Sequence, residues 1–430
     1  MAANAVEIPT SATGELLTAD GRPLKESLQR SLRRRKLTAL ALVAPAVVFL
    51  FVLFGMPVLY LMTWSVDDKL INEVLPRTFD NYEQWDGDGV PSEPHYEAMF
   101  KDIADATGLQ IGRGSTRMNY AKSKWKSLMK KTKRKVKALL GKDPDFAGPY
   151  KETLLQIDKR WGDISFWHSL GIMKDPYTAG YYLNSFDLKY GFGNEVVQQP
   201  ENRRIYNTLW LRTLLISVLV TAACLALGYP VAHLLATLPL RYSNLLLICV
   251  LMPFWTSLLV RIVAWMIMLQ QEGVVNDTLV ALHVVDDDNR LPMMYNFTGT
   301  VIVMVQILLP FMILPVYSVM KGISPAYMKA AQNLGAPPAI AFIRVYLPQT
   351  LPGVGAGVIL VFIVAIGYFI TPELVGGKDG QMIGNYIARH LRATLNWGLA
   401  SAMGVILLTA ILVLYWVYDR IVGIDNMKMG

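Results

Sequence analysis

The chain is 430 residues long, with 53% hydrophobic residues, 17% charged residues and a net charge of +8 at pH 7. A mean hydropathy of +0.33 is a poor match to a water-soluble enzyme, in which about a quarter of the residues are charged. A helix that crosses a bilayer needs about 20 largely apolar residues. Six windows reach that length and predict an all-α membrane protein with six transmembrane helices: 37–66, 210–238, 245–269, 298–320, 354–375 and 400–418.

The N-terminal tail, residues 1–36, carries a cluster of Lys and Arg just before the first window. By the positive-inside rule this cluster places the N-terminus in the cytoplasm. Six crossings return the C-terminal tail, residues 423–430, to the same side, and they make the segment 321–350 a cytoplasmic loop. A cleaved signal peptide is the alternative for the first window, but the uncharged run is longer than the about 7–15 apolar residues of a signal.

Residues 67–208 form a polar insert, which we expect to be helical and to lie outside the cytoplasm, because long loops translocate largely regardless of their charge. Within it, residues 113–142 contain twelve of the chain's 41 Lys and Arg and no Asp or Glu. Twelve exceeds the net charge of +8, so the positive charge of the chain depends on this run. Apolar residues at helical spacing predict an amphipathic basic helix here: Trp125, Leu128, Met129, Val136, Leu139 and Leu140.

Four interpretations of this basic helix remain open. It is a solvated face of the insert, a contact with the anionic membrane surface, a contact with an acidic patch on a partner protein, or a nucleic-acid site, which the outward topology disfavours. The sequence predicts no metal centre. Cys224 and Cys249 both lie in predicted membrane helices, and the acidic triplet 286–288 beside His283 is better explained as a solvated turn.

The five later windows form a membrane core, residues 209–422. The segment AAQNLGAPPAIAFIRVYLP (330–348) joins the fourth and fifth of the six predicted helices. Ser324 and the proline after it predict the start of a short helix, and Gly335 can end that helix in the left-handed conformation. Two prolines then suit the start of a second short helix that ends near Pro348. Such a segment suits docking into a groove of another protein, or it is only a connector.

The order Ala-Ala, three residues, Gly, nine residues, aliphatic, one residue, Leu-Pro resembles the EAA loop of ABC-importer permeases. Lys329 stands where that family has a glutamate, and the matching residues are Ala330, Ala331, Gly335, Val345, Leu347 and Pro348. Five further stretches resemble the permeases of spermidine/putrescine-type importers: FDNYEQW (79–85), MPFWTSLLVRIVAW (252–265), ILLPFMILPVYSVM (307–320), FITPELVGG (369–377) and MIGNYI (382–387). Residues 86–204 do not match the family pattern.

This resemblance implies the type I ABC importer permease fold in a bacterial inner membrane, with the chain forming half of a translocation path. It implies that the EAA loop docks on a cytoplasmic ATPase dimer that uses ATP and Mg²⁺. It also implies a second, different permease subunit and an extracytoplasmic substrate-binding protein. The implied cargo is putrescine or spermidine, with another small ion or metabolite as the alternative.

The chain itself contains no G-x-x-x-x-G-K phosphate loop, so we expect it to be no enzyme and to bind no cofactor of its own. No nucleophile, metal or acid/base constellation favours a membrane-embedded enzyme. The rival from another class is a membrane-anchored receptor or scaffold that works through the basic insert.

A path for a polycation favours carboxylates and aromatic faces, which attract cations. Ionisable residues inside membrane helices are functional candidates by default. Four residues fit a polycation: Glu373, near the outer end of the fifth helix, Tyr368, Trp255 and Trp265. Arg261 in the third helix is better explained as structural or gating. The two tryptophans could equally pack or lie at the membrane interface. Three other candidates for the path, Thr256, Gln306 and Thr371, could equally hydrogen-bond between helices.

Overall fold

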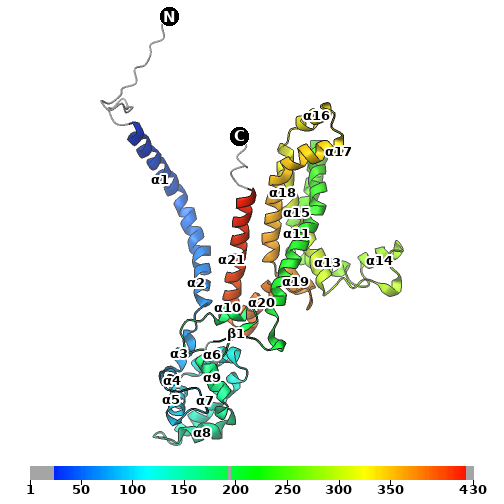
Figure 1. The fold of residues 1–430 in the computed structure, drawn as a ribbon. Helices are drawn as coiled ribbons and strands as arrows, with labels where there is room; N and C mark the ends of the chain where they lie inside the picture. Colours follow the sequence, from blue (N-terminus) through cyan, green and yellow to red (C-terminus); the bar gives the residue numbers. More distant parts are fainter. Residues whose placement is uncertain (1–23, 192–194, 423–430) are drawn as a thin grey trace. The chain divides into compact units, whose positions relative to one another are not determined.

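The computed structural model describes residues 24–191 and 195–422. The predicted C-terminal tail and the first 23 residues of the predicted N-terminal tail lie outside this part. The chain divides into two units, residues 1–63 and 64–430. The first unit contains α1 (Leu24–Leu50), the π-helical turn η1 (Phe51–Gly55) and all but the last residue of α2 (Met56–Trp64), which follow one another (Figure 1). The apolar stretch Ser31–Trp64 within them is long enough to cross a membrane, as predicted for the first window.

The insert is predominantly helical, as the sequence predicts. Its two short strands, β1 (Leu188–Tyr190) and β2 (Val196–Gln198), pair antiparallel, with Lys189 opposite Val197. Its α-helices are α3 (Lys69–Val74), α4 (Pro76–Tyr82), α5 (Glu93–Asp105), α6 (Gly108–Ala121), α7 (Trp125–Leu140), α8 (Tyr150–Ile157), α9 (Ile164–Gly171) and α10 (Gly180–Asn184). Short 3₁₀ turns at Lys159–Gly162 and Glu201–Arg203 complete it.

Three tryptophans fill the core of the insert: Trp125, Trp161 and Trp167 are almost fully buried. Each indole N–H donates a hydrogen bond, to Ser169 Oγ at 2.8 Å, to Thr132 Oγ1 at 3.0 Å and to the Trp161 carbonyl at 2.9 Å, respectively. Burying indoles with their donors satisfied gives apolar contact without an unpaired polar group. The insert therefore has a hydrophobic core of its own.

The sequence predicts one helix for the basic run, but the structure divides this run between two helices. It is interrupted between α6 and α7, where Lys124 has a φ of 79°. The break turns the chain so that Trp125, the first residue of α7, enters the core. The amphipathic prediction itself is confirmed, because Leu128, Met129 and Val136 are fully buried.

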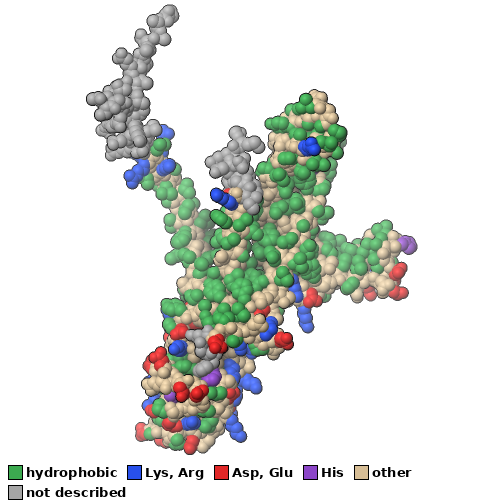
Figure 2. All heavy atoms as spheres, viewed as in Figure 1, with side chains coloured by type: hydrophobic (Ala, Val, Ile, Leu, Met, Phe, Trp, Pro, Cys, Tyr) green, Lys and Arg blue, Asp and Glu red, His purple; other side chains and the backbone are tan. Residues whose placement is uncertain are grey.

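The second unit also holds the helices of the membrane core. Its long helices are α11 (Tyr206–Thr237), α15 (Phe297–Gly322), α18 (Leu347–Ile366) and α21 (Trp397–Val422). Helices α11, α15 and α18 pack on one another, and the approach is close: a Cβ on Gly357 of α18 would lie 2.8 Å from Met312 Sδ of α15. Small residues at helix contacts are the usual means of close packing in membranes. Figure 2 shows the flanks of these helices covered by apolar side chains.

Two of the predicted windows are broken rather than straight. The third window is divided into α12 (Leu240–Leu251) with a 3₁₀ turn (Met252–Trp255) and α13 (Leu258–Met268), bent by 100° from one another. Pro253 lacks the N–H that a continuous helix would need. The described residues hence contain five apolar spans, or six if the bent pair is one span.

The fifth window is also displaced toward the N-terminus. Its apolar span runs from Pro338 to Ile366, and the residues beyond it form a separate short helix, α19 (Ile370–Val375). Glu373 therefore lies in α19 and not in the fifth spanning helix. The chain continues through α20 (Ile383–Arg389) and the π-helical turn η8 (His390–Thr394) into α21.

Buried polar contacts join the insert to one end of this bundle. Asp68 accepts a bidentate pair from Arg117 of α6, with Nε–Oδ1 at 2.6 Å and Nη2–Oδ2 at 2.5 Å, and the guanidinium lies over the ring of Tyr181 in α10. Tyr181 in turn packs against Gly398 of α21. The carboxylate of Asp187 accepts the first N–H groups of α11, from Ile205, Tyr206 and Asn207.

Removing one partner of the Arg117–Asp68 pair should destabilise the insert. Asp68→Asn leaves the guanidinium buried without its carboxylate, and breaking a buried pair in this way costs about 3–5 kcal/mol. Tryptophan fluorescence during denaturant unfolding of the purified chain measures this loss. The control is Glu97→Gln, which removes an exposed ion pair with Lys101 and should cost less than about 0.5 kcal/mol. Equal effects of the two changes would contradict the assignment.

The same junction should make stability depend on pH through His390. Burial and the neighbouring Arg389 lower the pKa of His390 from 6.5 to about 4, and its ring contacts Tyr206 Oη at 3.0 Å and Thr394 Oγ1 at 2.8 Å. The unfolded chain binds the proton first, so the stability present above pH 6.5 is lost as pH falls toward 4, by at most about 3 kcal/mol. His390→Gln should flatten the dependence of Tm on pH in this window, whereas a change of the exposed His283 to Asn should not.

Candidate functional site

The first site is the loop between α15 and α18. It begins with α16 (Ala326–Asn333), whose first free N–H, that of Ala326, donates to Ser324 Oγ at 3.3 Å. Gly335 then has a φ of +87°, as the sequence predicts, and α17 (Pro338–Ala341) follows. The second helix does not end near Pro348, because α17 continues through the π-helical turn η7 (Phe342–Tyr346) into α18.

The outward side of α16 is unusually exposed and apolar. Ala326, Ala330 and Leu334 follow one another at helical spacing, all exposed, and the Leu334 side chain is 89% exposed. Tyr327, at 56% exposure, and Lys329 lie on the two flanks of this stripe. An exposed leucine at the end of a stripe of small residues is the arrangement expected of a surface that inserts into a partner's groove. We call Tyr327, Lys329, Ala330 and Leu334 the coupling face.

The predicted coupling residues belong to two groups. Lys329, Ala330, Ala331 and Gly335 lie in or directly after α16, whereas Val345, Leu347 and Pro348 lie in η7 and the first turn of α18. No Asp or Glu occurs anywhere in residues 321–350. Within this loop, the charged side chains are therefore all basic.

A cluster of three rings, not found from the sequence, joins this loop to α11. His233 of α11 lies between two rings of η7, with centroids 5.4 Å from Phe342 and 5.2 Å from Tyr346, both edge to face. The two η7 rings stack at 5.4 Å. Movement of α16 and α17 would thus act on α11 as well as on α18.

The second site lies toward the other end of α15 and α18, where α19 packs on α13 and on α15. Tyr368 is next to Thr371, which is fully buried, and within electrostatic range of Arg261. In the described part of the chain, Arg261 Nε and Gln306 Oε1 are buried and have no hydrogen-bond partner. Such atoms are costly unless a ligand or a second state of the protein uses them.

The other predicted path residues have different environments. Glu373 is exposed, and its Oε2 accepts a hydrogen bond of 2.7 Å from Asn385 Nδ2 of α20, a partner that sequence reasoning missed. Trp255 and Thr256 are exposed at the bend between α12 and α13, and Trp255 is 74% exposed. Trp265 is half-buried against the bundle core. The structure therefore brings Arg261, Tyr368 and Thr371 together but leaves Trp255 outside that group.

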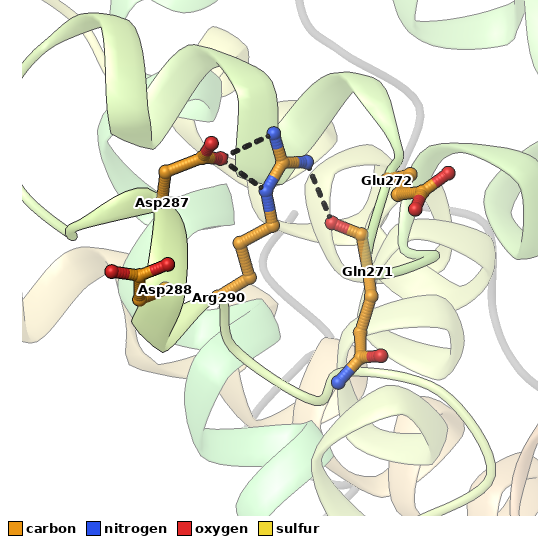
Figure 3. A pocket seen from close by; sticks show the side chains of 5 residues that line it. All are labelled: Gln271, Glu272, Asp287, Asp288 and Arg290. Atoms are coloured by element: carbon orange, nitrogen blue, oxygen red, sulfur yellow. Dashed lines mark hydrogen bonds and ion pairs between the residues drawn. The ribbon is translucent and has the colours of Figure 1, made fainter.

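A hollow of about 400 Å³ lies beside α14 (Val274–Ala281), at the loop that contains the acidic triplet. Figure 3 shows Arg290 between Asp287 and the Gln271 carbonyl, at 2.8 and 2.9 Å. Arg290 also donates to Asp277 at 2.8 Å. Among the described residues, no group of three or more His, Cys, Asp or Glu is placed to hold a metal. We therefore interpret the hollow as the space beside a turn that Arg290 holds in place.

Comparison with known proteins places these sites in context. The sequence model of the family described as "Binding-protein-dependent transport system inner membrane component" matches residues 225–423. The spermidine/putrescine transport system permease protein PotB of Escherichia coli (strain K12) is 36% identical over 222 residues, which cover 51% of this chain and 80% of that protein. PotB of Haemophilus influenzae is 34% identical over 225 residues, with coverage of 52% and 78%.

Among solved structures, a bacterial ABC transporter involved in the import of the acidic polysaccharide alginate aligns over 52% of this chain and 81% of that chain, with 18% identity and a TM-score of 0.43. The family model begins at residue 225, after the insert. It includes α16, η7, α19 and α20, so both candidate sites lie within the matched region.

Proposed function

The chain belongs to the family of inner membrane components of binding-protein-dependent transport systems, the permease subunits of ABC importers, and we propose that it forms half of a path for polyamines. It is a multi-pass membrane protein and a transporter subunit. The coupling face carries the transport proposal, because it is an exposed apolar surface on the loop that leads through α17 and η7 into a spanning helix. The scaffold alternative accounts for neither the loop nor the matched helices.

We propose that the coupling face docks in a groove of a cytoplasmic ATPase dimer. Leu334 would fill the groove, and the small Ala330 would let the groove approach the backbone. Lys329 and the absence of acids in residues 321–350 favour a groove with a negatively charged rim. The partner would bind ATP and Mg²⁺, while this chain has no ATPase site and binds no cofactor.

The α16 and α17 helices would transmit the partner's movement along η7 into α18, and through His233 into α11. A nucleotide can change the transport state only through contacts that differ between states, and the coupling face would supply them. With this loop in the cytoplasm, we propose that the insert lies outside, since the insert joins the bundle at the end opposite α16 (Figure 1). The six predicted crossings and the basic cluster before the first of them support a cytoplasmic position for both termini.

Two further partners complete the proposed importer. A second, different permease subunit would cover exposed apolar side chains of the bundle, among which Leu211 and Trp416 are 69% and 65% exposed. A soluble binding protein would deliver the cargo to the outer end. No nucleic acid is involved.

Polyamines are the proposed cargo because the PotB proteins, which are named for spermidine and putrescine transport, are similar to this chain over the matched region, and because the site chemistry fits. Glu373, held by Asn385, offers an exposed carboxylate at the outer end of the bundle. Arg261 would repel a polycation, so we place it beside the path, where its unpaired Nε becomes bonded in another state of the cycle.

The coupling proposal predicts that Gly335→Asp uncouples transport. The φ of +87° is strained for any residue with a Cβ, by about 1–3 kcal/mol, and the side chain would enter the groove. We expect membrane insertion to persist while copurification of the ATPase and ATP-driven uptake fall at least about tenfold, which is about 1.4 kcal/mol. Gly322→Asp adds the same charge to the end of α15 without a positive φ and should retain both. Full retention of ATPase copurification and of uptake by the Gly335 variant would contradict the coupling assignment.

The cargo proposal predicts that Glu373→Gln slows polyamine uptake about tenfold, because the neutral amide keeps the acceptor for Asn385 but loses the attraction for an ammonium group. Uptake of labelled putrescine and spermidine into proteoliposomes that hold the full complex is the measurement. Glu272→Gln, in the loop beside α14, should stay within about twofold of the parent. If the parent complex hydrolyses ATP but imports neither polyamine, the cargo proposal is wrong and the permease assignment stands.

A further inference from the structure

The outer surface of α7 carries a stripe of four basic side chains. Lys126, Lys130, Arg134 and Lys137 follow one another at i, i+4, i+8 and i+11, which places them on one side of the helix. All four are exposed. The opposite side of α7 is buried and consists of Trp125, Leu128, Met129, Thr132 and Val136. We call the four residues the basic stripe.

Other basic residues of the same run have structural partners. Arg117 pairs with Asp68, Lys131 pairs with Asp158 at 2.9 Å, and the Lys133 ammonium donates to the carbonyls of Ile103 and Ala104 at the end of α5. In the described part of the chain, none of the four residues of the basic stripe has an ion pair within 4.0 Å. Contacts within the insert therefore account for Arg117, Lys131 and Lys133 but for none of the four side chains of the basic stripe.

The position of the stripe narrows its possible partners. The insert contacts the bundle through α6 and α10, where Tyr120 donates to the Thr394 carbonyl and Tyr181 packs on Gly398. In Figure 1, α7 and α8 lie in the half of the insert away from the spanning helices. A helix placed there faces the aqueous phase beyond the bundle and not the bilayer surface. The membrane-surface interpretation of the basic run is therefore disfavoured.

We propose that the basic stripe is the docking surface for the acidic face of the soluble substrate-binding protein. This inference rests on the proposed polyamine function. A receptor that selects polycations needs carboxylates around its cleft, and such a protein presents a negative potential to its surroundings. Four unpaired cations on one helix face attract that potential and repel free polyamine. The stripe thus favours cargo that arrives bound to the receptor over cargo that diffuses alone.

Complementary charge acts mainly on the rate of encounter, which it raises by about 10–10³-fold at low salt. The expected signature is a salt-dependent association rate constant. The probe is the putrescine-loaded polyamine-binding protein of the same organism, added to the full importer complex in nanodiscs of neutral lipid. Association is followed by surface-bound optical detection at about 50 and 300 mM salt, where the Debye length is roughly 14 and 6 Å.

The test variant reverses the stripe: Lys126→Glu, Lys130→Glu, Arg134→Glu and Lys137→Glu. The control carries the same net charge change at scattered exposed sites: Lys142→Glu, Lys159→Glu, Lys174→Glu and Lys189→Glu. We expect the stripe variant to associate at least about tenfold more slowly at low salt and to lose most of its salt dependence, whereas the control changes less than about threefold. Unfolding followed by tryptophan fluorescence verifies that both inserts are folded.

Three results would overturn this inference. The stripe variant could associate like the parent, the control could be slowed equally, or only binding to vesicles with anionic phosphatidylglycerol could change. In each of these cases, polyamine uptake by the parent complex would still support the proposed function. If the parent neither binds the loaded receptor nor imports polyamine, the proposed function itself has failed.

Discussion

Hydrocarbon offers no hydrogen-bond partner to a peptide group, so every N–H and C=O at that depth must be satisfied within the protein. The bundle meets this constraint with long helices, and the helical backbone is interrupted at two places. Both the bend between α12 and α13 and the break between α18 and α19 adjoin the contact of α13 with α19. Non-helical backbone at membrane depth is tolerated where protein or a water-filled cavity surrounds it. Under the proposed function, these two breaks would be suitable places for a translocation path.

The insert follows a different principle, because its core is that of a water-soluble domain. Three indoles with satisfied donors fill it, and it meets the bundle through both polar contacts and an apolar cluster that includes Tyr181 and Leu399. Arg117, Asp68 and Tyr181 fix its position on the corner that leads from η8 into α21. Burial raises the pKa of Asp68 while Arg117 opposes the rise, so the pair holds a charge in an environment that would otherwise neutralise it. A partner on the insert would act on the bundle through this corner.

Much of the architecture could be predicted from the sequence because it depends on local patterns. The length of the apolar runs located the spanning helices. Gly335 predicted a left-handed turn, because glycine adopts the left-handed conformation at little cost. The bend after α12 was less accessible, since hydropathy is the same for a straight and a bent helix, although Pro253 was a signal. Glu373 was misplaced for the same reason. The apolar run continues across the break at Gly367, so its composition concealed a separate helix.

The sites were predictable to different extents. The residues of the coupling face appeared through a spaced motif, but the exposure of Leu334 and the rings around His233 depend on tertiary packing that no spacing encodes. The basic run appeared as one helix because charge and periodicity continue through residues 122–124. The structure places a break at Lys124, directly before the buried Trp125. Asn385 could not be connected with Glu373 from the sequence, since twelve residues and a turn separate them.

The π-helical turn η7 has a consequence for how the coupling face acts. Each of its hydrogen bonds spans one residue more than in an α-helix, so the side chains before Phe342 are out of α-helical register with those after Tyr346. Under the proposed coupling, a force applied at Leu334 would reach α18 partly as a rotation about the helix axis and not only as a push along it. A screw motion of α18 would turn a different set of its side chains toward α11 and α15. The five residues of η7 would thereby convert docking at the coupling face into a change of the face that α18 turns toward the bundle.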